Sequence, residues 1–598
     1  MSTTLRHAEY YDMQKVFDDL YQRSENNATK GINLYKHIIS KENILLAYRN
    51  IKANTGSKTE GTDGITIDHY KMEDVDSFVD NIRNVLVDYK PNTVRRVEIP
   101  KPNGKKRPLG IPTMRDRLIQ QMFKQVLEPI CEAKFYKHSY GFRPNRSTHH
   151  AMARCQFLMN RGGYSHVVDI DIQGFFDNVN HSKLLKQLYN IGITDRRVLI
   201  IISKMLKAPI KGEGIPTKGT PQGGILSPLL SNVVLNYLDW WISSQWDTIK
   251  TRKPHTVQTK NYRLAKAKLK RMYIVRYADD FKIFTNNHQS ATKIFHAVEG
   301  YLKNQLHLNI SNEKSTITNL KRKSSDFLGF SIKSVKKSKR YVANTHVSEK
   351  KIKDILEKAR ILIKAIQKSP SGKTVQDYNS YVLGIKNYYK IATHVTIDFI
   401  EIAFRLSKTL FNRLKSIGKY KIPTNANALY KRTHRNNYRT FEIAGNHIYP
   451  LADIQTRFPQ SFSQDICNYT RKGRQKLIKS LKGNIANEMQ KMLLSSNRQS
   501  MEYADNRISR YSMQNGKCAV TGIFLMAEDA HCHHKVPKGM GGTDEFNNLI
   551  IVHEFVHRLI HATNEETIKI YMRLLQLSEN QLKKINKLRK VCNLVTLA

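Results

Sequence analysis

The sequence is poor in cysteine and has no long hydrophobic run. Six cysteines are scattered over 598 residues, which predicts free thiols in a reducing compartment. Residues 198–202, VLIII, are among the longest apolar stretches, and a bilayer span needs roughly 20 such residues, so we expect no membrane partner. The first residues, MSTTLRHAEYYDMQ, lack the hydrophobic core of a signal peptide. We therefore expect a cytosolic protein.

Acidic residues are also scarce relative to basic ones. The chain has 50 Asp and Glu against 99 Lys and Arg, a formal net charge of +49 that is spread along most of its length. A polyanion such as nucleic acid is the natural partner for this charge. A chain of this length should contain three or four domains, each able to bury a core.

Residues 273–284, YIVRYADDFKIF, predict a β-hairpin with Asp279 and Asp280 at its turn. Two adjacent carboxylates repel each other unless cations lie between them. A polymerase needs this arrangement, because paired divalent metals ionise the primer 3′ hydroxyl and stabilise the transferred phosphoryl group. Alone, an Asp-Asp turn is more often a solvated turn. The apolar run at 166–177, HVVDIDIQGFFD, adds Asp171 as a third carboxylate and makes the polymerase interpretation the stronger one.

A basic segment at 95–112 predicts two strands around a Pro-Asn-Gly turn. Lys101 and Arg107 could clamp a triphosphate there, since a guanidinium matches two phosphate oxygens at once. A solvated basic hairpin is the alternative. The turn at 140–144, YGFRP, carries an aromatic residue and Arg143, a pairing suited to gripping a template strand.

Two further positions suit nucleotide contacts. In the glycine-rich turn at 219–228, GTPQGGILSP, Gln222 can lie flat against a base pair or sugar edge. Lys314, in the segment LHLNISNEK, would lie near the point where pyrophosphate leaves. An ordinary turn and an ordinary surface lysine are the alternatives.

Helical patterns occupy much of the rest. Residues 1–90 are predicted mostly helical with a polar break at 54–64, and apolar residues four apart predict a helix over 115–133. From residue 346 amphipathic helices follow, and YVLGIKNYYKIATH offers tyrosines for RNA bases or for core packing. Residues 471–515 are strongly basic, as in a DNA-contacting region or a solvated linker.

The C-terminal part contains a histidine cluster. His557 and His561 are four residues apart, so on a helix both imidazoles face one way and can share a cation, with His533 completing the metal site. His534 would then point elsewhere and be free to deprotonate a water molecule. A structural zinc site and unrelated surface histidines are the alternatives.

Taken in order, RPLGIP, YGFRP, DIDIQGFFD, GTPQGGILSP, YADD, NEK and FLGF resemble the reverse transcriptase blocks of group II intron-encoded proteins. The match spans roughly residues 45–335. NYYKIATH is similar to the maturase region of that family, and the tail from 516 resembles an HNH endonuclease.

The resemblance implies roles for particular residues of the polymerase. Asp171 and Asp279 would ligate two Mg²⁺ ions directly, with Asp280 less directly engaged. Phe176 would exclude a 2′ hydroxyl and so favour dNTPs. Lys101 and Arg107 would hold the triphosphate.

In the tail, the same resemblance makes His534 the general base and Asn548 the residue that orients the loop. His533, His557 and His561 would hold a divalent metal, Mg²⁺ or another. HNH tails of this family commonly carry two Cys-x-x-Cys pairs that bind zinc. Here the corresponding segments are CAVT at 518–521 and HEFV at 553–556, so we expect apolar packing in place of that zinc, and leave open a metal shared by Cys518 and His553.

The expected fold is an α+β multidomain chain. It comprises a right-hand polymerase, with fingers and an antiparallel palm over 1–340 and a helical thumb and maturase region over 341–470. A basic DNA-binding region over 471–515 and a ββα-metal HNH domain over 516–598 follow.

The expected function combines RNA-directed DNA synthesis, intron RNA binding with splicing assistance, and DNA cleavage for intron mobility. Partners would be group II intron RNA, target DNA and dNTPs in a bacterial cytosol or nucleoid, with a homodimer left open. A splicing factor with a silent polymerase, or a reverse transcriptase of host defence or repair, are the alternative functions.

Overall fold

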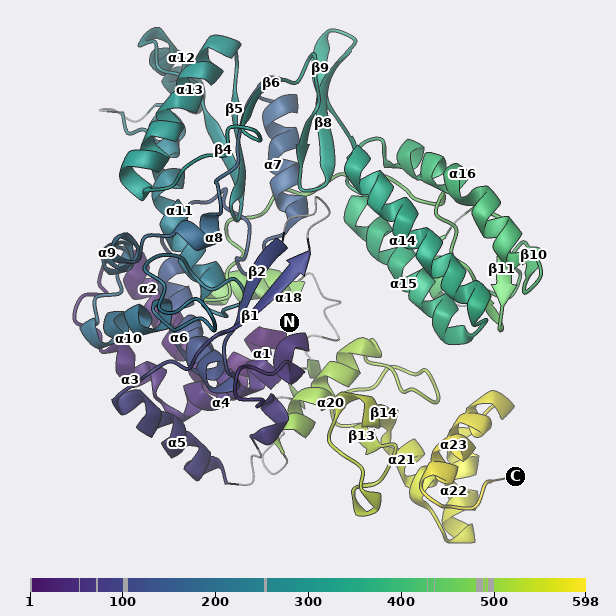
Figure 1. Ribbon diagram of the computed structural model, residues 1–598. Coiled ribbons are helices and arrows are strands. Elements are labelled where there is room, and N and C mark those ends of the chain that lie inside the picture. The colour runs from purple at the N-terminus through teal and green to yellow at the C-terminus, as the bar shows by residue number, and fades with distance from the viewer. Residues whose placement is uncertain are drawn as a thin grey trace.

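The structure is a computed structural model. It describes residues 3–52, 54–70, 74–100, 106–251, 255–426, 428–434, 436–479, 485, 488–489, 491–492 and 500–597. Figure 1 shows a large mixed α/β body, a helical bundle beside it and a small C-terminal part below that bundle. Within the described residues, no helix is both long enough and apolar enough to cross a membrane.

The N-terminal part is helical, as predicted. Its helices are α1 (Thr3–Tyr10), α2 (Met13–Glu25), α3 (Leu34–Ile38), α4 (Lys41–Lys52), α5 (Val75–Val87) and α6 (Met114–Glu132). Leu118, Met122, Val126 and Ile130 of α6 are all buried, which confirms the helix predicted from their spacing. Because α2, α3 and α4 also pack on it, α6 is the central helix of this region.

The predicted basic hairpin is present. Strands β1 (Arg95–Pro100) and β2 (Lys106–Ile111) pair antiparallel, with Ile99 opposite Arg107. The Pro-Asn-Gly turn between them lies outside the described residues.

A four-stranded antiparallel sheet forms the centre of the body. Its order is β4-β5-β3-β6, with β3 (His166–Ile170), β4 (Tyr273–Tyr277), β5 (Asp280–Thr285) and β6 (Thr316–Asn319). Helices α7 (Thr148–Asn160), α11 (Ser227–Ser244) and α13 (His288–Tyr301) contact these strands. Short helices connect the strands: α8 (Phe175–Asn178), α9 (His181–Ile191), α10 (Arg196–Leu206) and α12 (Val257–Lys266).

A second sheet leads into the helical bundle. Strands β7 (Ser325–Phe327), β8 (Phe330–Lys337) and β9 (Arg340–Val347) precede α14 (Glu349–Lys368), α15 (Gly372–Tyr389) and α16 (Val395–Leu414). Phe327 and Phe330 of the FLGF segment are buried, and Tyr388 stacks on Phe330 with ring centroids 5.6 Å apart. Tyr388 therefore contributes to core packing at the junction between sheet and bundle.

Small elements complete the bundle region: β10 (Lys419–Lys421), α17 (Ala428–Thr433), β11 (Thr440–Ile443) and β12 (Asn446–His447). The C-terminal part contains α18 (Arg471–Lys479), α20 (Met501–Met513), β13 (Ala530–His534), β14 (Leu549–His553), α21 (Glu554–His561), α22 (Glu565–Leu575) and α23 (Glu579–Val591). Its apolar cluster joins α20 to β13, β14, α21 and α23.

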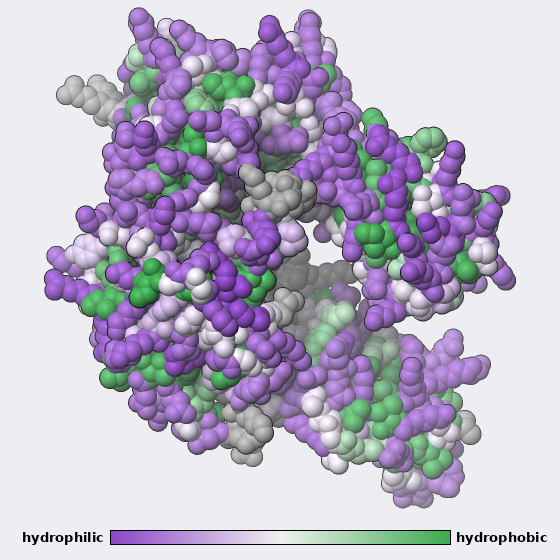
Figure 2. All heavy atoms as spheres, in the orientation of Figure 1, coloured by the Kyte–Doolittle hydropathy of each residue, from purple (hydrophilic) through white to green (hydrophobic). Residues whose placement is uncertain are grey.

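The surface agrees with the composition. Figure 2 shows a mainly hydrophilic face that is hollowed between the body, the helical bundle and the C-terminal part. A highly cationic chain with such a hollow suits a large polyanionic ligand.

Candidate functional site

The turn between β4 and β5 carries two of the predicted carboxylates, Asp279 and Asp280. Tyr277 pairs with Asp280 across the hairpin, so Ala278 and Asp279 form a two-residue connection. Ala278 has a φ of 58°, in the left-handed region that residues with a Cβ rarely adopt. Such strain persists only where neighbouring groups fix the backbone.

Arg276 and Gly141 provide those neighbours. The Arg276 side chain is 1% exposed, donates to Ala278 O over 2.8 Å and forms a buried ion pair with Asp239. Gly141 packs so closely that a Cβ there would lie 2.2 Å from Ala278 N. Arg276 is not among the residues predicted from the sequence. The only indication of its role in the sequence is that a charged residue interrupts an apolar strand.

Arg143 does not contact a template strand, and that prediction is wrong. The residue is 6% exposed, and its guanidinium forms an ion pair with Glu132 at 2.9 Å. It also donates to the carbonyl oxygens of Tyr136 and Ser139. Its charge and donors therefore stabilise the fold around the YGFRP turn. Phe142 remains 52% exposed and lines the pocket that contains Asp171.

Asp171 directly follows β3 and is held by the loop before β6. Its backbone N–H donates to Ser315 Oγ over 3.1 Å, and its carbonyl accepts from Ser311 N–H over 2.7 Å. Lys314, in the same loop, places Nζ 3.1 Å from Asp171 Oδ2. The predicted carboxylate and the predicted lysine are thus direct partners.

Two pockets meet at these residues, and both are lined by Asp171, Asp279 and Lys314. One of them also contains Phe176 and Gln222. Five predicted residues, which come from four separate motifs, therefore face one cavity. Such a cavity has the parts needed to receive a nucleotide: acids, a cation, an aromatic ring and an amide.

The other pocket, which does not contain Phe176 or Gln222, places Asp280 beside the ion pair of Lys282 and Asp169. Lys282 is 2% exposed, pairs with Asp169 and donates to Ser325 Oγ over 2.6 Å. Asp280 is exposed at the start of β5, but the protein around its carboxyl group removes part of its hydration and raises its pKa to about 6; Lys282 opposes the rise, while Asp169 and the other nearby acids add to it. Asp280 therefore takes up a proton more readily than an ordinary aspartate, and a nearby cation would favour its charged form.

The donor set suits a hard divalent cation. Carboxylate oxygens are the ligands that Mg²⁺ prefers, and Asp171 and Asp279 line both pockets. The oxygens of the three acids are not all within 4.8 Å of one another: among the described residues only a histidine cluster meets that limit. Cations between these acids would draw them closer.

The predicted triphosphate ligands, Lys101 and Arg107, come from the basic segment of the sequence that contains β1 and β2. Lys101 lies outside the described residues, and of Arg107 only the strand position in β2 is described. Pro108, the next residue, lines the pocket with Phe176 and Gln222.

The C-terminal part has the expected ββα arrangement. Strands β13 and β14 pair antiparallel, with His534 opposite Leu549, and α21 follows β14 directly. His533 on β13 and His557 and His561 on α21 offer ligand atoms that all lie within 4.8 Å of one another.

These three imidazoles fit a divalent transition metal. His533 is 1% exposed, and its buried Nε2 has no hydrogen-bond partner. Burial, with the neighbouring imidazoles, lowers the pKa of His533 to about 3 and that of His557 to about 4. Neutral imidazoles are the form that ligates metals, and borderline metals such as zinc accept three of them.

His534 differs from the expectation in one respect. It is not free, because Asp544 Oδ1 lies 2.7 Å from His534 Nε2. A carboxylate there favours the tautomer with hydrogen on Nε2, which leaves Nδ1 as the nitrogen that can take a proton. Asp544 is missing from the predicted site residues. The sequence indicates Asp544 only as an acidic residue two positions after a glycine pair, and that pattern alone does not predict a contact with His534.

Asn548 closes the loop between the two strands. Its side chain accepts from Val536 N–H over 2.9 Å and donates to the carbonyls of Val536 and Thr543. Gly542 lies against the same segment, since a Cβ there would be 1.8 Å from Val536 O. The loop is therefore tightly folded around the Asn548 amide.

One residue of each degenerate cysteine pair, Cys518 and Val556, is packed in the apolar cluster as expected, while Thr521 and His553 are half-buried. Cys518 is 2% exposed, and its Sγ accepts backbone N–H groups of Thr521 and His553. Val556, at the position of a fourth ligand, is fully buried in the apolar cluster. Among the described residues Cys518 and His553 belong to no group of three candidate ligands.

Comparison with known proteins agrees with this geometry. The family model described as "Reverse transcriptase (RNA-dependent DNA polymerase)" matches residues 99–332. The chain is 31% identical over 448 residues to the group II intron-encoded protein LtrA of Lactococcus lactis subsp. cremoris, covering 63% of this chain and 74% of LtrA. It is 32% identical over 301 residues to Protein YkfC of Escherichia coli, covering 48% and 78%.

A third relative is the putative COX1/OXI3 intron 2 protein of Saccharomyces cerevisiae, 27% identical over 457 residues, 66% of this chain and 52% of the relative. The similarity to LtrA extends beyond the polymerase match and covers most of that protein. This chain therefore belongs to the family of group II intron-encoded reverse transcriptases and maturases.

Proposed function

We propose that the chain copies RNA into DNA at the pocket formed by Asp171, Asp279, Phe176 and Gln222. The primer 3′ hydroxyl would attack the α-phosphorus of a dNTP, and pyrophosphate would leave. Two Mg²⁺ ions, when bound by the carboxylates, would lower the pKa of that hydroxyl and offset charge on the phosphoryl group. The single observation that carries the proposal is the convergence of these separate motifs on one cavity.

The other residues would orient the substrate. Phe176 is half-buried, and its ring packs edge-on against Phe175 at 5.4 Å, which suits a rigid wall against a ribose 2′ hydroxyl. Gln222 would border the nascent base pair, and Lys314 would neutralise charge on the departing pyrophosphate. Lys101 and Arg107 would hold the triphosphate.

The Asp279→Ala variant tests the polymerase. It should abolish primer extension with Mg²⁺ and dNTPs, yet leave intron RNA binding and splicing assistance intact, because RNA binding does not need the carboxylates. Equal loss of both activities would contradict the separation of the two functions.

We further propose that the domains follow the predicted boundaries, with a helical thumb and maturase region over 341–470 that binds the parent intron RNA. In support, α14 buries Ile355, Leu356, Ala359 and Ile363 on one side and carries lysines along the rest. That arrangement gives a stable helix with a cationic surface. The basic region over 471–515 would contact target DNA.

We infer that the ββα unit is a DNA endonuclease of the HNH class, which opens target DNA for priming. His534 would deprotonate a water molecule through Nδ1, and Asn548 would keep the loop folded around it. A divalent metal held by His533, His557 and His561 would stabilise charge on the scissile phosphate. His534→Ala should stop second-strand cleavage and leave extension of an added primer unchanged; undiminished cleavage would remove the assignment.

A further inference from the structure

Helix α20 contacts the proposed general base and its orienting acid. The Tyr503 ring stacks on His534, with centroids 5.3 Å apart and planes inclined by 16°. Ser500, the N-cap residue of α20, donates through Oγ to the Asp544 carboxylate, which also pairs with His534. Tyr503 Oη donates to Cys532 O over 3.0 Å. One end of α20 thus holds both members of the His534–Asp544 pair.

The same helix also fixes the loop that connects β13 and β14. Asn506 Nδ2 donates to Asp544 O over 2.8 Å, and Arg510 Nε donates to Phe546 O over 2.7 Å. The Arg510 guanidinium lies 3.8 Å from the centre of the Phe546 ring. Because these bonds hold backbone carbonyls, a movement of α20 would move the loop with it.

A neighbouring face of α20 is attached to the N-terminal helices. Asp505 forms an ion pair with Arg49 of α4 at 2.7 Å, and its carboxylate lies 2.9 Å from Nε2 of His7 on α1. Glu502 forms a second ion pair, with Lys52 of α4 at 3.1 Å. These contacts join parts of the chain more than 440 residues apart in sequence.

The contacts of Asp505 with Arg49 and His7 are partly buried, so their stability depends on matched charges. The side chains of Asp505 and Arg49 are 12% and 11% exposed, and that of His7 is 4% exposed. Burial alone would raise the pKa of Asp505, but the hydrogen bonds and charges of His7 and Arg49 lower it to about 2. Removing one partner of such a pair leaves an uncompensated buried charge, which is strongly destabilising.

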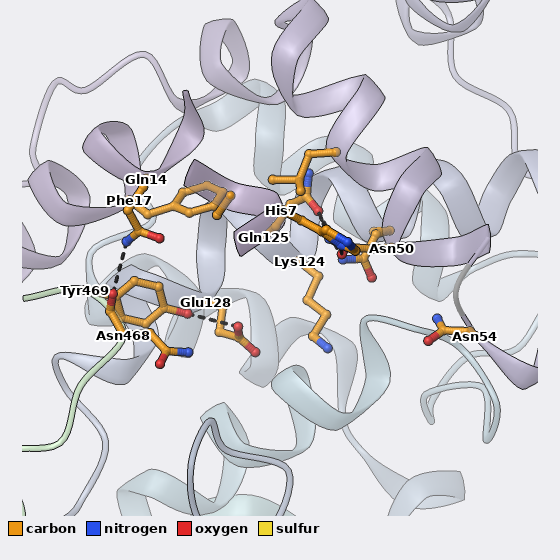
Figure 3. Close-up of a pocket in the computed structure, with 13 residues that line it drawn as sticks. His7, Gln14, Phe17, Asn50, Asn54, Lys124, Gln125, Glu128, Asn468 and Tyr469 are labelled. Carbon is orange, nitrogen blue, oxygen red and sulfur yellow. Dashed lines mark hydrogen bonds between the residues drawn. The ribbon is translucent and has the colours of Figure 1, made fainter. Parts of the chain in front are cut away.

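The contacts of His7 continue into the core of the N-terminal region. Figure 3 shows His7 and Asn50 facing each other in the wall of a pocket, with His7 Nδ1 3.3 Å from Asn50 Oδ1. Asn50 Nδ2 donates to Gln125 Oε1 over 3.1 Å, and Gln125 belongs to the buried helix α6. A continuous set of contacts therefore leads from α6 through His7 and Asp505 to His534.

We propose that α20 is a positioning strut, which holds His534 and Asp544 in place only while Asp505 and Glu502 are docked on α1 and α4. The proposal rests on the nuclease function proposed above. It makes cleavage by the tail dependent on attachment to the reverse transcriptase body, so a tail that has come away from the body does not cut DNA.

The test is a charge swap in the full chain assembled with intron RNA. Arg49→Asp and Asp505→Arg, each alone, should lower the single-turnover rate of second-strand cleavage at least about 10-fold, with target affinity unchanged. The double variant should recover to within about 3-fold of the wild type, since it restores an ion pair. Arg49→Lys, which keeps the charge, should cleave almost normally.

Hydrogen exchange supplies a readout that does not depend on cleavage. Amides of residues 531–548 should lose protection in both single variants and regain it in the double variant. Primer extension by Arg49→Asp should stay near the wild-type rate, which shows that the body remains folded. Lys41→Asp is the matched control, because Lys41 is on α4 but pairs with exposed Asp76.

Each outcome decides the proposal. Normal cleavage and normal amide protection in the single variants would overturn the proposed role of α20. Losses of cleavage and protection that the double variant does not recover would overturn it too. If the wild type fails to cleave, the nuclease assignment falls, and the exchange data alone decide: protection lost and regained supports the strut, while unchanged protection overturns it.

Discussion

The ammonium of Lys314 lies 3.1 Å from Asp171 Oδ2, so a lysine already neutralises the carboxylate that the proposed chemistry requires for a metal. Both residues line the two pockets that meet at Asp279. The pair places a cation beside the proposed metal site, where it would oppose metal binding but would also neutralise the pyrophosphate that leaves in the proposed reaction.

Replacing Lys314 should separate these two effects. Lys314→Met removes a positive charge beside Asp171, so the Mg²⁺ concentration for half-maximal primer extension should fall about 2- to 5-fold. The maximal rate should fall about 10- to 100-fold, because charge on the departing pyrophosphate is no longer stabilised. Steady-state extension measured over a Mg²⁺ titration checks both values.

Lys293→Met is the control for this change, since Lys293 is an exposed lysine of α13 outside both pockets. It should match the wild type. An unchanged maximal rate in Lys314→Met would show that the lysine takes no part in the reaction.

Gly141→Ala should disable the polymerase without unfolding the protein. The new Cβ would lie 2.2 Å from Ala278 N and 2.9 Å from Tyr277 C, so the turn that carries Asp279 must shift. A displacement near 1 Å at a catalytic group can cost about 100-fold in rate. We expect a loss of that size in primer extension, with intron RNA affinity unchanged in a filter-binding assay.

Gly300→Ala serves as its control, because a Cβ at Gly300 meets no atom within 4 Å. It should extend primers at the wild-type rate. Normal extension by Gly141→Ala would mean that the turn tolerates the shift.

The elements of the site could be predicted from the sequence because their signals are local. The apolar runs around Asp279 and Asp280 predicted the hairpin. The four-residue spacing of His557 and His561 predicted that both side chains lie on one face of a helix. Each pattern lies within a dozen residues, where periodicity is informative.

The supporting residues could not be predicted, because their partners are distant in sequence. Asp239, which neutralises Arg276, is 37 residues away from it, and Asp505 is 456 residues from Arg49. Arg143 failed for a different reason, because Glu132 is only 11 residues away from it: in a chain this basic, an arginine suggests nucleic acid until its ion pair with Glu132 is seen. Charge alone does not distinguish a buried ion pair from a phosphate contact.

Lys386 should make the stability of the helical bundle rise with pH. It is buried on α15, donates to the carbonyls of Pro450 and Asp453, and burial lowers its pKa to about 7. The ordinary lysine pKa is 10.5, so between pH 7 and 10.5 the unfolded chain holds the proton more firmly than the folded one.

Stability attributable to this group therefore increases across that window and is flat below it. The free energy of unfolding of the wild type, minus that of Lys386→Met, should rise with pH by up to about 1.4 kcal/mol per unit. Urea unfolding of the bundle at pH 7 to 9.5 measures it. Lys373→Met, which changes an exposed lysine of α15, should leave the wild-type slope intact. Equal slopes for wild type and Lys386→Met would mean that the folded bundle keeps the lysine charged, with its two carbonyl acceptors offsetting the lost hydration.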